Sequence, residues 1–166
     1  MNWEAVSAAA DVIGAGAVVI TLIYLAIQTR DNVIVERARA VWDAQNSFVE
    51  VNDMLADGGP VSELVFVSLS DPDSLSEKDR YLVHRFARGW FQRMEAQYAL
   101  YKAGILEPEV WQLRLGYVKA ILDNTIFKEF WELDKKNSMF TKRFIEAIDG
   151  ATFKGFSGFM GITKST

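Results

Sequence analysis

The sequence predicts an all-α protein with one N-terminal transmembrane helix, a helical-bundle domain and an irregular tail rich in glycine and phenylalanine. Three observations support this fold class. The residues from Val12 to Thr29 form a long uncharged stretch. After it, apolar residues recur at spacings of three and four, which is typical of one face of a helix, and no alternation indicates a sheet. Finally, residues 153–164 break the helical pattern with a glycine at every third position.

We expect the first element to be a transmembrane helix over residues 5–29. The uncharged run from Val12 to Thr29 would rise about 27 Å as a helix, close to the ~30 Å hydrocarbon core of a bilayer. Trp3 and Tyr24 lie near its two ends, where aromatic side chains anchor at the membrane interface, and Arg30 follows directly. The same run also fits the buried first helix of a soluble bundle, which is the alternative.

Basic residues follow the apolar run and none precedes it. Arg30, Arg37 and Arg39 lie on its C-terminal side, whereas the residues before it include Glu4 and no lysine or arginine. The positive-inside rule then predicts a periplasmic N-terminus and a cytoplasmic C-terminal domain at the bacterial inner membrane. A cleaved signal peptide would begin with a basic segment, so we do not expect one.

Two features inside the span could carry function. Four small residues share one face of the predicted helix: Ser7, Ala10, Gly14 and Ala17. Their short side chains would let another helix approach closely. The alternative is that glycine and alanine are simply frequent in membrane helices. Asp11 is the acid within the span. It lies near the predicted outer end, where headgroups and water would solvate it, and an ion or proton pathway is the alternative.

The opening of the chain resembles a recurrent group of small bacterial membrane proteins. Those chains start with Met-Asn-Trp, continue through a span rich in valine and small residues, and end it with a Tyr-Leu-Ala-x-Gln-x-Arg-x-Asn pattern. The matching positions here are Met1, Asn2, Trp3, Gly14, Tyr24, Leu25, Ala26, Gln28, Arg30 and Asn32. The group usually has Glu at the position of Asp11. The resemblance implies a single-pass anchor and a helical cytoplasmic domain, and it implies no activity.

Residues 30–57 predict a connecting amphipathic helix. Its apolar residues Ile34, Val41, Phe48 and Leu55 are seven apart. This spacing is typical of a coiled coil, and the apolar span and this segment could form one long helix that projects into the cytoplasm. Three heptads are short for a coiled coil, so we favour an ordinary helix that packs on its own domain. Gly58-Gly59-Pro60 should end it.

Residues 58–149 predict the helical domain. The segment 61–69 is apolar and fits either a helix or an extended chain. Ser76 has the sequence context of an N-cap for a long helix over 77–102, and Pro108 suits the first turn of the next helix. Shorter helices should cover 126–133 and the region of 140–148. The long helix should present an apolar face made of Leu82, Phe86, Trp90, Met94, Tyr98 and Tyr101.

Residues 150–166 form a tail in which phenylalanine and glycine alternate in a threefold pattern. Phe153, Phe156 and Phe159 would lie on one side of an extended chain. Exposed rings are unfavourable in water, so we expect them to be covered by the chain's own domain, by the membrane interface or by a partner. Docking on a partner is the hypothesis for this segment.

The composition excludes several chemistries. The chain has no cysteine, so thiolate metal sites and disulfides are excluded, and its single histidine, His84, cannot supply a di-iron bundle site. A pI near 5.1 gives no support for nucleic-acid binding. We therefore expect no metal, no cofactor and no catalytic residue.

A basic cluster on the predicted helix over 77–102 has two possible roles. The cluster consists of His84 and four arginines, Arg80, Arg85, Arg88 and Arg93, and no carboxylate lies at helical spacing from the histidine. The cluster could contact anionic lipid headgroups. We favour internal pairing with the acidic helix Glu36–Asp57, because residues 1–76 carry eleven acids against three arginines.

These features favour a non-catalytic, membrane-anchored accessory, scaffold or assembly subunit of a larger membrane complex, for example an energy-transducing one. Its expected partners are the lipid bilayer and other membrane-protein subunits or copies of itself. A homo-oligomeric pore, suggested by Asp11 and the heptad spacing, is the alternative. A lipid- or metabolite-handling enzyme is a third class, because a cleft built from distant carboxylates and tyrosines would leave no motif.

Overall fold

The chain is all-α over the residues that the structure describes. The computed structural model describes the backbone of residues 3–151 and the side chains of residues 3–4 and 13–151. Over this range it has six α-helices, one short 3-10 helix and no strand. The chain divides into two compact units, residues 1–40 and residues 41–166. The boundary lies inside the segment 30–57 that the sequence predicts as a connecting helix.

The first unit contains the N-terminal part of helix α1 (Trp3–Ala56). From Ile13 onward α1 includes one stretch that is long and apolar enough to cross a membrane by length and composition. Its large side chains are exposed on every side; Ile20 is 70% exposed and Ile23 is 56% exposed. The core helix of a soluble bundle buries one face, and this stretch buries none, as a lipid-facing helix does in the absence of lipid.

The few hydroxyl groups of this stretch are satisfied within the helix. Thr21 and Thr29 donate from Oγ1 to the carbonyl oxygens of Ala17 and Leu25, each at 2.8 Å. Polar groups in a bilayer need such internal partners, because no water is present to bond them. The two threonines are therefore compatible with a membrane-spanning helix.

The C-terminal part of α1 belongs to the second unit and packs into its core. Val51 is 3% exposed, and Phe48 and Leu55 pack against the buried cluster. Two of the four apolar residues spaced by seven thus pack on the domain itself, whereas Ile34 is 56% exposed. Gly58, at φ +68°, follows the helix end, and Pro60 opens α2 (Pro60–Ser70). The segment 61–69 is therefore helical.

Local sequence signals set the ends of the remaining helices. Ser76 caps α3 (Glu77–Lys102), its Oγ accepting from the Asp79 N–H at 3.1 Å. Gly104, at φ +67°, lies just past its end. The other elements are η1 (Pro72–Ser74), α4 (Pro108–Leu122), α5 (Thr125–Lys136) and α6 (Lys142–Asp149). The capping serine and the proline start of α4 are confirmed.

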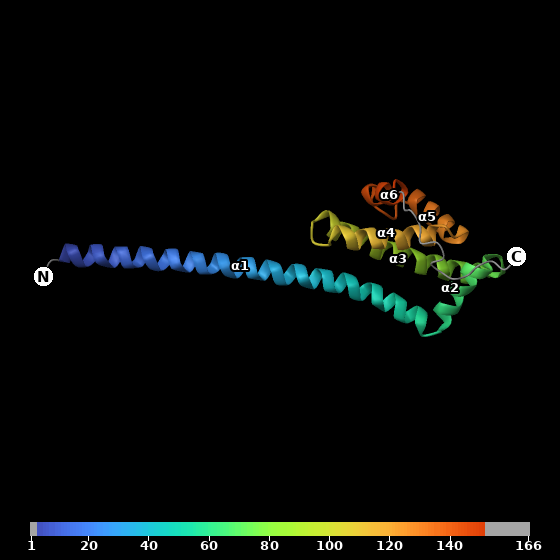
Figure 1. Cartoon of the computed structure of the whole chain (residues 1–166), viewed down its shortest axis with the longest axis horizontal. Coiled ribbons are helices and arrows are strands. Elements are labelled where there is room, and N and C mark those ends of the chain that lie inside the picture. The colour runs from blue at the N-terminus through green and yellow to red at the C-terminus, as the bar shows by residue number, and fades with distance from the viewer. Residues whose placement is uncertain (1–2, 152–166) are drawn as a thin grey trace. The chain divides into compact units, whose positions relative to one another are not determined.

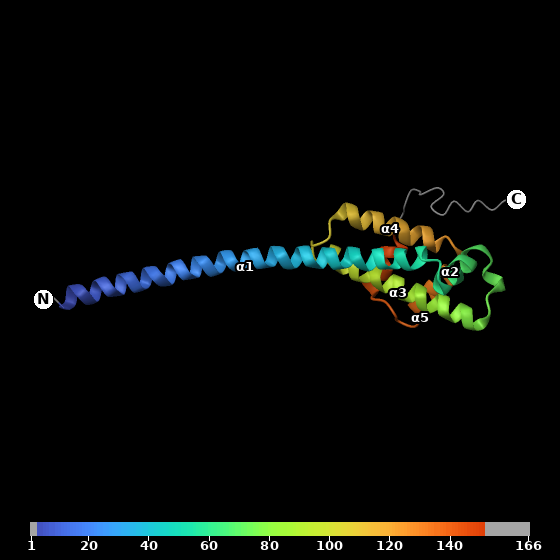
Figure 2. The same cartoon turned by 90° about the horizontal axis from the view of Figure 1, so that it is seen from below.

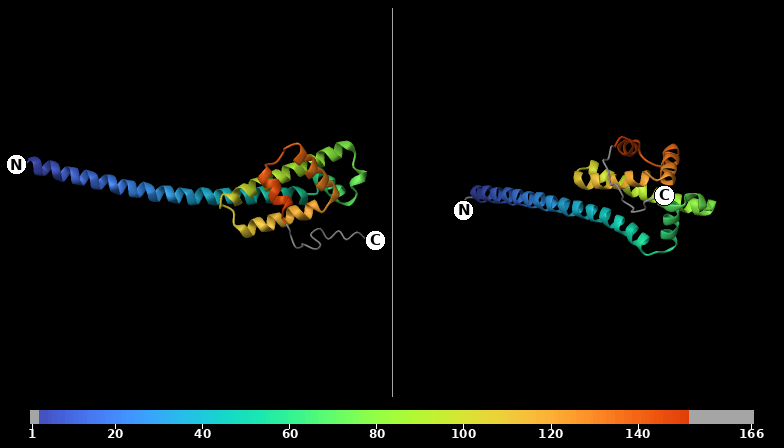
Figure 3. Two further views of the ribbon diagram at one scale, coloured as in Figure 1. Left: turned by 90° about the horizontal axis from the view of Figure 1, so that it is seen from above. Right: turned by 45° about the vertical axis from the view of Figure 1, so that its right-hand side comes forward.

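Helix α3 is the centre of the second unit. It packs against α2, α4 and α5, and α6 packs against α4 (Figure 1). The part of α1 beyond residue 40 runs alongside α3 and α4 (Figure 2). Two further views show the helices of this unit from other sides (Figure 3). One hydrophobic core therefore receives side chains from all six α-helices.

Aromatic rings dominate this core. Phe91 and Phe144 are fully buried, and Trp131 stacks on Phe140 with ring centroids 4.9 Å apart. Most of the predicted face of α3 is confirmed: Trp90 and Met94 are buried, and Phe86, Tyr98 and Tyr101 pack against the core. Leu82 is the exception at 42% exposed, and Val83, Ala87 and Phe91 are buried in addition.

Candidate functional site

A buried cluster of charged side chains links α3 to α5. The carboxylate of Asp134 is almost fully buried. It accepts hydrogen bonds from Arg88 Nε at 3.0 Å and Arg88 Nη2 at 2.6 Å. His84 Nε2 lies 2.9 Å from Asp134 Oδ1, and the histidine ring stacks on Phe130. The hydrogen bond to Asp134 raises the pKa of Arg88, although burial opposes this.

This cluster is best explained as a structural ion pair. A His–Asp contact can orient a general base, but here Arg88 binds the same carboxylate and neutralises it. The sequence pattern missed Asp134, because the aspartate lies on a different helix, fifty residues after His84. No local spacing could have identified it.

The expected pairing of the basic cluster with the acidic segment Glu36–Asp57 is wrong. Arg80 pairs with Glu129, and Arg88 pairs with Asp134, both on α5. The physical reason is that α5 packs directly on α3 and places its own acids opposite these arginines. Arg85 is exposed, so contact with anionic lipid stays a prediction for that residue.

A second arginine is held without an acid. Arg114, on α4, is half-buried, and its Nε donates to Gln97 Oε1 at 3.0 Å. Its Nη2 donates to Gln45 Oε1, and its Cζ lies 4.0 Å from the centroid of the Phe48 ring. Gln97 is itself only 2% exposed and donates to the Ala44 carbonyl oxygen. Burial lowers the pKa of Arg114.

An apolar cavity of about 270 Å³ is lined in part by the Phe48 ring that Arg114 contacts. Its lining comes from five helices, α1 to α5: Phe48, Val51, Asn52, Leu55, Val65, Leu69, Phe86, Trp90, Tyr117, Ile121 and Phe127. Val51 and Phe127 are buried, whereas Asn52 is exposed, so the cavity reaches from the core to the surface. A site of this kind accepts an apolar group.

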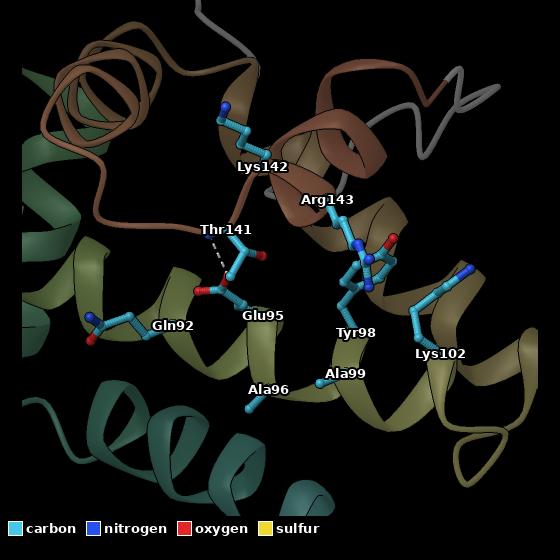
Figure 4. A pocket seen from close by; sticks show the side chains of 9 residues that line it. All are labelled: Gln92, Glu95, Ala96, Tyr98, Ala99, Lys102, Thr141, Lys142 and Arg143. Carbon is cyan, nitrogen blue, oxygen red and sulfur yellow. Dashed lines mark hydrogen bonds between the residues drawn. The ribbon is translucent and has the colours of Figure 1, made fainter.

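A wider pocket of about 820 Å³ lies between α3 and the start of α6, with its side chains drawn in Figure 4. Its cations are Lys102, Lys142 and Arg143. Glu95 accepts a 2.7 Å hydrogen bond from the Thr141 N–H and thereby places a carboxylate at the N-terminus of α6. Because the helix end already has its own anion and the cations are exposed side chains, this pocket is open surface with a basic rim.

The residues predicted for the membrane segment fall into two groups. Trp3, Tyr24 and Arg30 are exposed on α1, as are Gly14 and Ala17. Three further predicted residues have side chains outside the described part of the chain: Ser7, Ala10 and Asp11. The predicted docking tail with Phe153, Phe156 and Phe159 also lies outside the described residues. The structure brings none of the exposed five together into a site.

Among side chains 3–4 and 13–151, no group of three or more histidine, aspartate or glutamate residues is placed to hold a metal ion. Comparisons with protein-family models, with curated proteins and with solved structures found no match.

Proposed function

We propose that this protein is a membrane-anchored, non-catalytic accessory or scaffold subunit of a larger membrane complex. One observation carries the proposal: α1 has an apolar stretch, exposed on all sides from Ile13 onward, that is long enough to cross a membrane. In this proposal α1 anchors the chain in the bacterial inner membrane, with the N-terminus in the periplasm. Arg30, Arg37 and Arg39 follow the apolar stretch and support a cytoplasmic location for the helical domain.

The pairing of the charged side chains supports a non-catalytic role. The sequence has one histidine, His84, and the carboxylate beside it, that of Asp134, is bound by Arg88. A carboxylate that already accepts two hydrogen bonds from a guanidinium is committed to holding two helices together. A structural ion pair therefore explains why His84, Arg88 and Asp134 lie together, and no catalytic role is needed to explain it.

The pore alternative loses part of one of its two supports, although Ile34, which shares the heptad spacing, is 56% exposed. Phe48 and Leu55, which have the heptad spacing, pack into the core of their own domain. They are therefore not available to form a coiled coil with other copies. The other support, Asp11, has a side chain outside the described residues.

The mass of the full-length protein in mild detergent tests the proposal. A tagged chain is extracted from native membranes, and native mass spectrometry determines the mass of the complex and identifies the proteins that co-purify with it. We expect a stoichiometric complex with at least one different membrane protein. A ring of identical copies would replace the accessory role with a pore, and a plain monomer would contradict both.

A variant of the tail tests where the partner docks. Replacing Phe153, Phe156 and Phe159 together by serine should release the partner, because the rings would no longer be buried against it. The matched control replaces Lys154 and Lys164 by serine and should keep the partner. Both variants should unfold at the temperature of the parent protein. Retention of the partner by the triple serine variant would place docking elsewhere.

A further inference from the structure

The apolar cavity and Arg114, which has no carboxylate partner among the described residues, both contact the ring of Phe48. Phe48 lines the cavity, and the Cζ atom of Arg114 lies 4.0 Å from the centroid of that ring. Tyr117, one turn after Arg114 on α4, also lines the cavity, and its ring centroid is 5.6 Å from that of Phe48. The arginine is therefore one ring away from the apolar lining.

The charge of Arg114 is not balanced by the residues around it. Its guanidinium donates to the neutral side-chain amides of Gln97 and Gln45, and the hydroxyl-bearing side chain of Tyr117 also interacts with it electrostatically. A guanidinium has five N–H donors and stays protonated at neutral pH, so donors remain for a further acceptor. By contrast, the guanidinium groups of Arg80 and Arg88 each have a carboxylate partner.

Holding a half-buried cation without an anion has a cost. Burial removes hydration from the Arg114 guanidinium and lowers its pKa, and the interaction with Tyr117 opposes this only in part. A carboxylate bound beside it would form charge-assisted hydrogen bonds of the stronger kind. One guanidinium matches one singly charged head group, which favours a carboxylate over a doubly charged phosphate.

The size of the cavity limits what can enter it. A cavity of ~150 Å³ lined by Leu, Ile and Phe is enough to hold benzene. The cavity here, at about 270 Å³, suits a group nearly twice that size, such as part of one alkyl chain. Most of its lining is aliphatic or aromatic, and Asn52, Tyr117 and Trp90 are the members with a polar side-chain group.

We propose that this cavity binds the alkyl chain of a fatty acid and that Arg114 binds the fatty-acid carboxylate. The apolar lining removes the chain from water, and the unbalanced guanidinium supplies the charge complement. Gln97 and Gln45 hold the guanidinium in place through its Nε and Nη2 atoms. The site does not depend on the accessory role, so either can fail while the other stands.

Photolabelling of the full-length protein tests the site. The protein is reconstituted in phosphatidylcholine vesicles with dodecanoic acid that carries a diazirine on its chain, and labelled peptides are mapped by mass spectrometry. We expect saturable labelling of peptides that contain cavity residues, with the methyl ester of the same probe labelling them about tenfold less. Equal labelling by acid and ester would overturn the role of the carboxylate.

Arginine variants separate the charge from the fold. Arg114→Met should reduce labelling of the cavity by the acid about tenfold, whereas Arg114→Lys should keep it within about threefold. Arg80→Met is the matched control, because Arg80 also lies over a phenyl ring, that of Phe130, but pairs with Glu129. Unchanged labelling of the Arg114→Met variant would overturn the proposal.

Filling the cavity gives an independent test. Ile121→Phe places a ring in the cavity and should abolish labelling there, while Leu100→Phe, at a half-buried position outside the lining, should not. Thermal unfolding of each variant shows that it is folded. Labelling that persists in Ile121→Phe, or that falls only on residues 13–35 of α1, would overturn the site. Stronger labelling by dodecyl phosphate than by the acid would overturn the assignment to a carboxylate.

Discussion

Arg88 donates from both Nε and Nη2 to the buried carboxylate of Asp134, at 3.0 and 2.6 Å, and so joins α3 to α5. Each partner is costly to leave unpaired, because an isolated buried charge loses its hydration without compensation. The pair therefore stabilises the packing of these two helices only as long as both members are present.

Removal of Asp134 should destabilise the domain strongly. Asp134→Ala leaves Arg88 and His84 without their shared acceptor, and we expect the free energy of unfolding to fall by about 3–5 kcal/mol. Chemical denaturation followed by tryptophan fluorescence measures this. Glu129→Ala is the control, because the Glu129–Arg80 pair is about half exposed and should contribute under ~1 kcal/mol. Equal losses in the two variants would contradict the structural role of Asp134.

The aromatic core should be sensitive to truncation. Phe91 is fully buried, with its ring against those of Trp90, Trp131 and Phe140. We expect Phe91→Ala to lower the free energy of unfolding by about 3–5 kcal/mol, since it leaves a cavity. Phe66→Ala, at a side chain that is 61% exposed, should change it by less than ~0.5 kcal/mol. A large loss at Phe66 would show that this ring is covered in the protein.

The cap of the central helix should contribute measurably. Ser76→Ala removes the acceptor for the Asp79 N–H, and we expect a loss of about 1 kcal/mol in the free energy of unfolding. Ser70→Ala is the control: its hydroxyl donates back to the Phe66 carbonyl within α2 and caps nothing. Its effect should stay below ~0.5 kcal/mol. A matched effect of both changes would contradict the cap.

Acid should weaken the contact around Asp149. Burial acts to raise the pKa of Asp149, but hydrogen bonds from Lys135 at 2.8 Å and Trp131 at 3.0 Å outweigh it and hold the pKa below the usual range. The stabilisation is therefore present above the unfolded-state pKa and is lost as the pH falls below about 4. Unfolding free energies measured across this range should fall more steeply for the parent protein than for Asp149→Asn. Parallel curves would contradict the linkage.

Cysteine labelling can determine the orientation of the chain. Because the sequence has no cysteine, single-cysteine variants have no background. We expect a membrane-impermeant maleimide to label Asn2→Cys in intact spheroplasts, whereas Asn137→Cys should react only after lysis. The reverse pattern would invert the proposed topology. Labelling of both in intact cells would contradict a single span.

The sequence alone determined the elements and many of their ends. The uncharged run from Val12 to Thr29 identified the candidate membrane helix, because apolarity over such a length needs no tertiary information. Ser76, Gly104 and Pro108 marked helix boundaries, because caps, left-handed glycines and first-turn prolines act on the backbone within a few residues.

Only the tertiary structure decided which side chains meet. Helical spacing placed Arg80 and Arg88 on one face of α3, but their acids came from α5 rather than from the segment 36–57, because helix packing selects the partner surface. The contact of Arg114 with Phe48 joins residues of α4 and α1 that are 66 positions apart, beside a cavity lined by five helices. Such a site has no local pattern, since its members share only a place in the packed core.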